Sequence, residues 1–395
     1  MEKLLFLVHR LPYPPNKGDK IRSFHFLKAL SLQYEIYLGT FVDDPEDWQY
    51  EQTVKSYCQE TCCVSLNPRI SKVKSLTGLL SGEALSIPYY KNNVMQDWID
   101  QILTSASIKK VLIFSSVMAQ FVLNKQELEI ITDFVDVDSD KWRQYALKKK
   151  WPESWIYRRE SEKLLTFERQ VISRSSTGIF VSEQEAAHFQ ALASEYKDRI
   201  DFVNNGVDTD YFSPLLDYPS PFQVNVTPIV FTGAMDYWAN VDAVVWFAKA
   251  VFPSIYSNNP SARFFIVGSK PAKEVLTLSE LPGIVITGRV EDVRPYLAFA
   301  ALVVAPLRIA RGIQNKVLEA MAMEKTVLGT SAAIEGIPVN NQLRVFVEDD
   351  PLQAAQLACD LLSEKGGNKA ESNRHFVIDH FSWYSSTEKL ISIIN

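Results

Sequence analysis

Lys316 and Glu319 are the residues of this chain whose types and spacing most clearly suit chemistry. They are three positions apart, so in a helix they share one face. Gly312, just before them, lets the backbone turn and approach a ligand closely, and the first N–H groups of the following helix favour phosphate. This combination predicts a nucleoside diphosphate site, with Lys316 and the helix start at the phosphates and Glu319 at the ribose.

The surrounding sequence must bring this site to the edge of a parallel sheet. Short β-rich runs alternate with helical patterns in two successive series, which predicts an α/β protein with two doubly wound parallel sheets. Ligands of such sheets bind beyond the carboxyl ends of the strands. The expected strands are residues 4–8, 36–41, 111–114, 129–134, 178–181 and 200–203, and then 229–232, 264–267, 284–287, 302–305, 327–329 and 345–347.

Four prolines between residues 213 and 228 interrupt any regular element and indicate a linker. We therefore expect an N-terminal domain at 1–212, a linker at 213–228, a C-terminal domain at 229–380 and a last helix at 381–395. Ser382 is the expected cap of this helix, and Leu390, Ile391 and Ile394 form its apolar stripe.

Several stretches together resemble the retaining glycosyltransferases of the GT-B fold, and family 4 in particular. The resemblance covers nearly the whole chain and implies two facing Rossmann-like domains, with a C-terminal helix that returns to the first. A narrower likeness, at residues 11–15 and 136–142, is to sugar transferases of bacterial exopolysaccharide systems associated with exosortase (PEP-CTERM) sorting. The family-level stretches are residues 307–322, the Asn-Gly-Val-Asp sequence at 205–208, the Val-Ser-Glu sequence at 181–183, and the loops at 231–240 and 287–293.

The resemblance implies transfer, with retention, of a sugar from a nucleoside-diphosphate sugar to a saccharide or lipid-linked saccharide. It implies no cofactor and no essential metal. Lys316 and Arg308 would stabilise the departing diphosphate, and Asp136 would act as a polar contact or proton acceptor. The expected donor-binding residues are Gly18, Gly233, Met235, Tyr237, Asn240, Arg289, Val290, Arg311, Gly312, Ile313, Gln314, Asn315 and Glu319.

The sequence departs from the family pattern in three places. Residues 236–245 lack the arginine and lysine with which many members neutralise the diphosphate, so Arg308, Arg311 and Lys316 are the nearest candidates. Eight residues before Glu319 the family has a glutamate that contacts the sugar, and here that residue is Arg311. Because a guanidinium cannot accept hydrogen bonds, we expect Arg311 to reach the diphosphate or an anionic group of the donor. The opening loop keeps only Gly18 of the usual paired glycines.

A purely structural role stays open as the alternative for several of these residues. Each arginine could be a solvated loop charge, and Lys316 with Glu319 an exposed helical pair. The aspartates at 133, 136, 138 and 140 alternate after a predicted strand, and caps or turns explain any one of them without catalysis. We nominate Asp136 because relatives carry a functional histidine near this place.

Residues 141–159 combine seven basic residues and five aromatics with one acid. Such a composition suits an anionic membrane surface, where a lipid-linked acceptor would be presented. A solvated basic helix packed by tryptophans is the alternative, and single-stranded nucleic acid is a weaker one. The residues expected to face the membrane are Lys148, Lys149, Lys150, Trp151 and Trp155.

Bulk properties agree with an ordinary globular protein. The chain has 395 residues, 47% of them hydrophobic and 22% charged, and its net charge of −6 argues against a nucleic-acid binder. The four cysteines show no paired metal spacing, and we expect no secretory leader and no membrane span. The simplest expectation is a reduced, cytoplasmic protein, with a place at the inner face of the membrane as the alternative.

Two other functional classes can have a doubly wound fold of this kind. An NAD-dependent oxidoreductase is disfavoured because no GxGxxG sequence follows a predicted strand. A noncatalytic scaffold or a nucleotide-sugar-sensing protein of the same fold stays open, because expected loop cations and a glutamate are missing.

Overall fold

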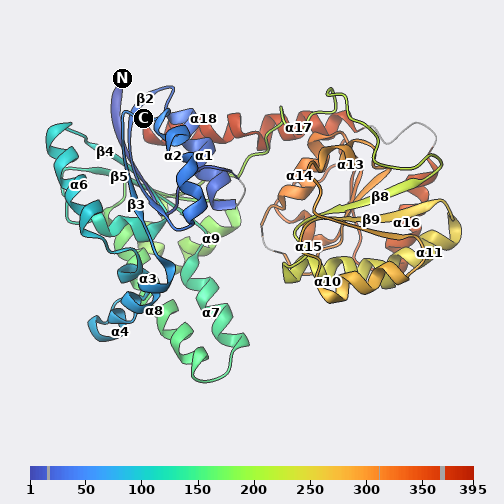
Figure 1. Ribbon diagram of the computed structural model, residues 1–395, viewed down its shortest axis with the longest axis horizontal. Helices are drawn as coiled ribbons and strands as arrows, with labels where there is room; N and C mark the ends of the chain where they lie inside the picture. The colour runs from blue at the N-terminus through green and yellow to red at the C-terminus, as the bar shows by residue number, and fades with distance from the viewer. Residues whose placement is uncertain (16–17, 311, 365–369) are drawn as a thin grey trace. The chain divides into compact units, whose positions relative to one another are not determined.

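The computed structural model of the protein describes residues 1–395 except 16–17, 311 and 365–369 (Figure 1). The side chain of Lys148 also lies outside the described part. The chain forms two compact units, of which one comprises residues 1–204 with 386–395 and the other residues 205–385.

The first unit is built on a seven-stranded sheet in the order β3-β2-β1-β4-β5-β6-β7. Every strand pair in it is parallel. The apolar run of β1 is buried from Leu4 to Val8, as expected for a central strand that helices cover on both faces. The strands are β1 (Glu2–Val8), β2 (Tyr34–Val42), β3 (Glu60–Ser65), β4 (Lys110–Phe114), β5 (Glu129–Val135), β6 (Thr177–Phe180) and β7 (Ile200–Phe202).

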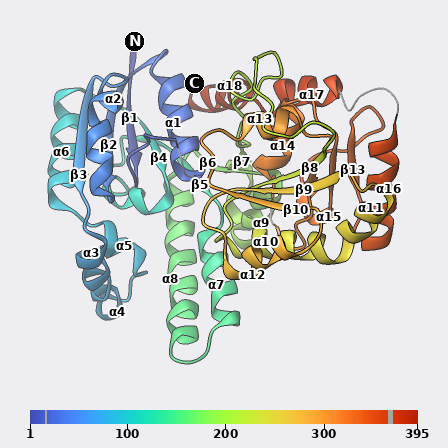
Figure 2. The same ribbon diagram turned by 45° about the vertical axis from the view of Figure 1, so that its right-hand side comes forward.

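Helices connect these strands, and two of them, α7 and α8, form a hairpin that protrudes from the unit (Figure 2). Three short 3-10 helices, η1 (Pro45–Tyr50), η2 (Ser116–Phe121) and η3 (Ser194–Arg199), complete the connections. The α-helices are α1 (Gly18–Leu30), α2 (Glu51–Lys55), α3 (Pro68–Ser75), α4 (Thr77–Ser81), α5 (Ser86–Tyr90), α6 (Asn93–Ser105), α7 (Asp138–Lys148), α8 (Glu153–Arg174) and α9 (Glu183–Leu192).

The second unit contains a six-stranded parallel sheet in the order β10-β9-β8-β11-β12-β13. Its strands are β8 (Thr227–Thr232), β9 (Ala262–Val267), β10 (Ile284–Gly288), β11 (Leu302–Ala305), β12 (Val327–Gly329) and β13 (Val345–Val347). Its helices are α10 (Trp238–Trp246), the π-helix η4 (Phe247–Val251), α11 (Phe252–Asn258), α12 (Lys273–Leu276), the 3-10 helix η5 (Thr277–Glu280), α13 (Arg294–Ala298), α14 (Asn315–Ala322), α15 (Ser331–Ile334), α16 (Pro351–Ser363) and α17 (Glu371–Phe381).

The last helix, α18 (Trp383–Ile394), belongs to the first unit from residue 386 onward. Ser382 caps it, because its hydroxyl accepts a hydrogen bond from the Ser385 amide at 3.1 Å. Lys389 Nζ lies 2.9 Å from Asp201 Oδ1 beside β7, and Leu390 is fully buried. The expected α/β fold of two Rossmann-like parallel-sheet domains with a returning C-terminal helix is thus confirmed.

Strand β3 is the one element of the two sheets that the strand expectations missed. It is an edge strand that pairs with β2, and its sequence Glu-Thr-Cys-Cys-Val-Ser has no apolar run. Val64 is the one buried position of β3. A half-exposed edge strand needs few apolar residues, so its pattern resembles that of a loop.

A buried ion pair ties helix α1 to strand β5 inside the first unit. Arg22 Nε lies 2.7 Å from Asp133 Oδ2, with side chains 1% and 0% exposed. Arg22 also donates to the Val203 carbonyl at 2.7 Å, and Asp133 accepts from the Val135 amide at 3.0 Å. Asp133 therefore has a structural role, in agreement with the alternative considered for these aspartates.

Replacing Asp133 with alanine is expected to lower the free energy of unfolding by about 3–5 kcal/mol, because the Arg22 guanidinium would stay buried without its carboxylate. Chemical denaturation followed by tryptophan fluorescence measures this loss. Asp201→Ala, which removes the half-exposed pair with Lys389, is the control and should cost under about 1 kcal/mol. Equally small losses of unfolding free energy in Asp133→Ala and Asp201→Ala would contradict the structural role of Asp133.

Candidate nucleotide-binding site

The start of helix α14 lies beyond the carboxyl end of β11, where ligands of parallel sheets bind. Gly312 in the connecting loop has φ +61°, a left-handed conformation that favours glycine, and no atom lies within 4 Å of where its Cβ would be. Gln314 precedes the helix and makes no side-chain cap. The amides of Asn315 and Lys316 therefore have no intrahelical acceptor, which is the arrangement that binds a phosphate.

Lys316 reaches from α14 to the end of β8 and the first turn of α10. Its Nζ donates to Asn240 Oδ1 at 2.6 Å and lies 4.2 Å from the centre of the Phe231 ring. Asn240 Nδ2 in turn donates to the Ala234 carbonyl at 2.9 Å. At Gly233 an added Cβ would stand 3.1 Å from Lys316 Nζ and 2.8 Å from Asn240 Nδ2, so glycine is needed for this close approach.

The surroundings of Lys316 shift the proton affinities of both charged groups. Burial lowers the pKa of Lys316 to about 8, although the neighbouring Glu319 carboxylate opposes this effect. Burial likewise raises the pKa of Glu319 to about 7 against the opposing charge of Lys316. Within the described residues no group donates a hydrogen bond to the Glu319 carboxylate. The Lys316 ammonium and the Glu319 carboxylate thus lie on one helix face, and both can form further hydrogen bonds to a ligand.

Most of the other expected donor residues lie on loops at the carboxyl ends of strands in this unit. Ile313, Gln314 and Asn315 are partly buried around the start of α14, Tyr237 is 55% exposed just before α10, and Arg289 is exposed after β10. Val290 packs partly against the core of the unit. Their binding roles stay predictions.

Two expected donor-site residues have partners within the protein. Met235 is fully buried, and its amide and carbonyl are bonded to Ser269 and Ala272, so it packs in the core of the unit. Arg308 is engaged by Asp242, with Nε 3.0 Å from Oδ2, so a role at the phosphates requires this ion pair to open. Both binding roles stay predictions. Arg311 lies outside the described residues.

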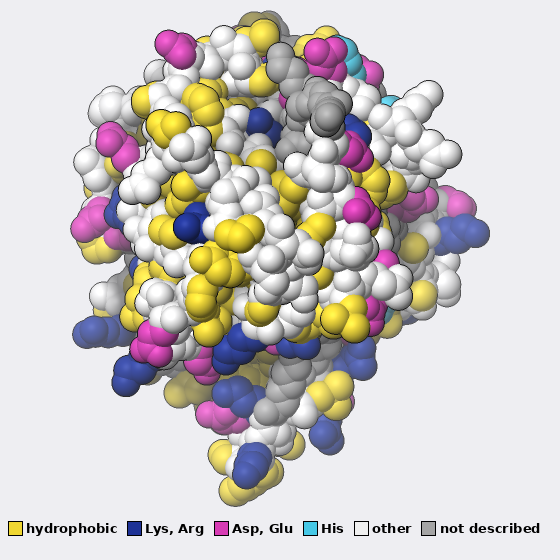
Figure 3. All heavy atoms as spheres, turned by 90° about the vertical axis from the view of Figure 1, so that its right-hand side faces the viewer, with side chains coloured by type: hydrophobic (Ala, Val, Ile, Leu, Met, Phe, Trp, Pro, Cys, Tyr) yellow, Lys and Arg dark blue, Asp and Glu magenta, His cyan; other side chains and the backbone are white. Residues whose placement is uncertain are grey.

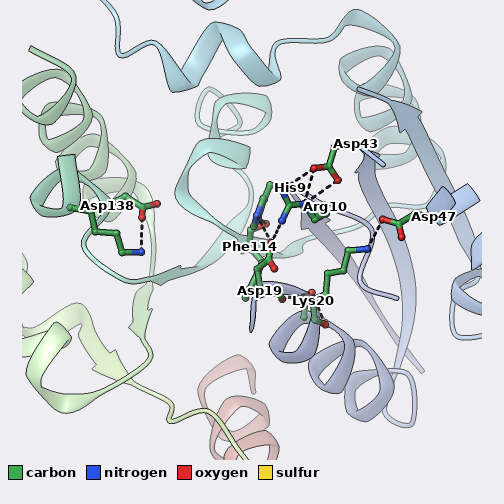
Figure 4. A network of polar contacts seen from close by, with 10 residues as sticks. His9, Arg10, Asp19, Lys20, Asp43, Asp47, Phe114 and Asp138 are labelled. Atoms are coloured by element: carbon green, nitrogen blue, oxygen red, sulfur yellow. Dashed lines mark hydrogen bonds and ion pairs between the residues drawn. The ribbon is translucent and has the colours of Figure 1, made fainter. Parts of the chain in front are cut away.

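The opening loop of the first unit carries a polar cluster that the site expectations did not include (Figure 4). Arg10 is bound by two carboxylates, at 2.7 Å from Asp19 and 2.8 Å from Asp43. His9 Nε2 lies 3.5 Å from Asp19 and its ring stacks on Phe114. Burial by itself would raise the pKa of Asp19, but the hydrogen bond from His9 and the charge of Arg10 hold it well below its usual range. The position of His9 at the end of the first strand was the one sequence signal for this cluster.

The other expected first-unit residues lie near the carboxyl ends of the same sheet. Gly18 begins α1, with open space around it. Asp136 follows β5, and its carboxylate is bound by Lys141 Nζ at 2.7 Å. The pKa of Lys141 is raised, because the charges of Asp138 and Asp136 outweigh the effect of burial. A role of Asp136 as proton acceptor therefore requires this ion pair to open, and it stays a prediction.

The described residues contain no group of three or more histidine, cysteine, aspartate or glutamate side chains arranged to hold a metal ion. The same residues include no helix that is both long and apolar enough to span a bilayer.

Residues 227–364 match the family model of glycosyl transferases group 1. None of the curated proteins matches the sequence. Among solved structures, a glycosyltransferase from Rickettsia africae is 16% identical with a TM-score of 0.62, over 100% of this chain and 98% of the other. Sucrose-phosphate synthase from Thermosynechococcus elongatus is 13% identical with a TM-score of 0.68, over 100% and 98%.

A third similar structure is Anabaena HepE in complex with UDP and glucose, at 12% identity and a TM-score of 0.61, over 99% of each chain. At these identities the likeness shows the fold. The chain therefore has the GT-B fold, and the segment that matches the glycosyl transferases group 1 model, residues 227–364, lies in its second unit.

Proposed function

We propose that the protein transfers a sugar from a nucleoside-diphosphate sugar to a hydroxyl group of a saccharide or lipid-linked saccharide. The observation that carries this proposal is the partly buried Lys316 ammonium at the open start of α14, inside the segment that matches the family model. A cation and free amides at one helix start suit a diphosphate, which is the leaving group of such a donor.

Each group near α14 has a role in this proposal. Lys316 and the amides of Asn315 and Lys316 hold the diphosphate and stabilise the charge that develops as it leaves. Glu319 accepts hydrogen bonds from the ribose hydroxyls, and the backbone at Arg289 and Val290 meets the base. The backbone of residues 312–314 lines the place of the sugar.

The finer features of the reaction belong to the same proposal. Membership of family 4, retention of configuration and independence of a metal rest on the sequence resemblance. A role in bacterial exopolysaccharide synthesis, at the cytoplasmic face of the membrane, rests on the narrower resemblance. HepE, which has been solved with UDP-glucose, makes UDP-sugars the first donors to test.

A noncatalytic scaffold or nucleotide-sugar sensor is the second candidate. It is favoured by the engagement of Arg308 by Asp242 and of Asp136 by Lys141, which leaves few free charged groups for catalysis. Such a protein would bind the nucleotide sugar without turning it over.

Lys316→Met is expected to weaken donor binding by about 10- to 100-fold, because it removes a charge-assisted contact worth about 1.5–3 kcal/mol. Thermal-shift titration with UDP-, GDP-, ADP- and dTDP-sugars finds the donor and measures the loss, since ligand at 100 times its dissociation constant stabilises the fold by about 2.7 kcal/mol. Lys249→Met, on an exposed lysine of the same unit, is the control. Equal affinity in the two variants would remove Lys316 from the site.

Donor affinity is expected to be highest between about pH 7 and pH 8. Below this range Glu319, whose pKa is about 7, takes up a proton and stops accepting from the ribose. Above it Lys316, whose pKa is about 8, loses its charge. Calorimetric titration with a nucleotide sugar across this range measures both limbs, and Glu319→Gln should flatten the acidic one. An acidic limb that persists in Glu319→Gln would count against the ribose role.

Turnover separates the two candidate functions. With a membrane extract as the source of acceptor, the wild-type protein should release nucleoside diphosphate, and Lys316→Met should lower kcat by about 100- to 1,000-fold. A coupled assay for the released nucleoside diphosphate follows the reaction. Binding of donor with no release above the rate of the extract alone would support the scaffold.

A further inference from the structure

Helices α3 and α4 carry large apolar side chains on the outside of the first unit. Leu80 is 93% exposed, Val73 68%, Ile70 56% and Leu76 53%. The buried positions of the two helices are the small residues Ser71 and Gly78. These helices therefore turn small residues inward and large apolar residues outward, which is the reverse of an ordinary surface helix. A contiguous apolar surface of this kind marks an interaction site.

The charged residues within helices α3 and α4 are all positive, and the acidic residue next in sequence, Glu83, follows α4. Residues 68–81 contain Arg69, Lys72 and Lys74 and no acidic residue, in a chain whose net charge is −6. All three are exposed, and within the described part of the chain none forms an ion pair. We call these cations, together with Ile70, Val73, Leu76 and Leu80, the α3–α4 surface. Its combination of apolar and cationic groups is complementary to an anionic lipid interface.

Helix α8 contacts α4 and the start of α5 through two consecutive residues. Arg159 donates to the Gly78 carbonyl of α4 at 2.6 Å. Glu160, which is buried, accepts from the Leu85 amide at 2.6 Å and from the Ser86 amide at 3.0 Å, at the start of α5. The bond from Arg159 thus attaches α4 directly to the long helix, and Glu160 fixes the segment that follows α4.

The same helix begins at the exposed tip of the α7–α8 hairpin. Trp151 is 81% exposed, Leu147 75% and Trp155 55%. Lys149 and Lys150 are exposed between them, with Lys149 paired to Glu153 at 3.2 Å. The backbone of Trp155 precedes that of Arg159 by four residues, about 6 Å along the helix axis.

Both surfaces lie at one end of the first unit. In Figures 1 and 2, α4 and the α7–α8 turn extend toward the same lower edge of this unit. Figure 3 shows basic and hydrophobic side chains together on the protruding lower tip. Two amphipathic surfaces attached to one helix can therefore meet a flat partner together.

We propose that the α3–α4 surface and the tip of the α7–α8 hairpin dock the protein on an anionic lipid bilayer. The exposed leucine, valine and tryptophan side chains enter the interfacial layer, and Arg69, Lys72 and Lys74 face the lipid phosphates. The contact is peripheral, in keeping with the lack of a spanning helix among the described residues. It deepens the part of the proposed function that places the protein at a membrane and rests on that part, whereas its test is independent of sugar transfer because docking requires neither donor nor acceptor.

Vesicle cosedimentation of the full chain, without nucleotide, tests this proposal. Wild type should bind vesicles of phosphatidylcholine mixed with phosphatidylglycerol and bind pure phosphatidylcholine vesicles much more weakly. Replacing Arg69, Lys72 and Lys74 together with glutamine should weaken binding on the order of 100-fold, at about fivefold per basic residue. Val73→Ser with Leu80→Ser should weaken it at least about tenfold, through loss of apolar insertion.

Matched controls use residues of the same kinds at other exposed places. Lys163, Lys197 and Lys273, each replaced with glutamine, test bulk charge, and Val224→Ser with Leu352→Ser tests bulk hydrophobicity. Both should bind as wild type does. Equal losses in the control and test variants, or equal binding to neutral and anionic vesicles, would overturn the proposal. So would a wild-type dimer that Leu80→Ser dissociates and that shows no vesicle binding, since the surface would then belong to a second copy.

Discussion

The second unit is organised around an ammonium group held partly away from water. Lys316 has one oxygen ligand, Asn240 Oδ1 at 2.6 Å, and the face of the Phe231 ring at 4.2 Å, whereas an ammonium can donate three hydrogen bonds. Burial lowers the pKa of this ammonium, which is the cost of holding it away from water. A bound diphosphate would supply the missing acceptors. Gly233, the side-chain amide of Asn240 and the uncapped start of α14 together hold the Lys316 ammonium where a diphosphate can reach it.

The first unit differs from the second, because its buried charged groups form ion pairs or hydrogen bonds with other groups of the protein. Arg22 is paired with Asp133, and Lys20 with Asp47. Arg10 is held by Asp19 and Asp43, and Asp136 by Lys141. These ion pairs fix the loops at the carboxyl edge of the sheet and leave little net charge there. Helix α3 differs, because its exposed Arg69, Lys72 and Lys74 form no ion pair within the described part of the chain.

Sequence patterns were sufficient to predict the central strands of both sheets, because parallel strands that are buried on both faces are continuous apolar runs, as at residues 302–305. They failed for β3, an edge strand without such a run. Local spacing also placed Lys316 and Glu319 on one helix face. It could not reveal that Met235 is buried or that Asp242 engages Arg308, because both depend on contacts between segments distant in the sequence. The outward-facing apolar residues of α3 and α4 escaped notice for the same reason, since burial is a property of the packed chain.

Amide hydrogen exchange with and without a saturating nucleoside diphosphate tests the central claim most directly. The account predicts that the ligand slows exchange at the amides of Asn315 and Lys316 and at the start of α10, which carries Asn240. Those two amides have no intrahelical acceptor in the free protein, so added protection there reports the phosphate itself. Saturating binding that leaves exchange at the start of α14 unchanged would contradict the account.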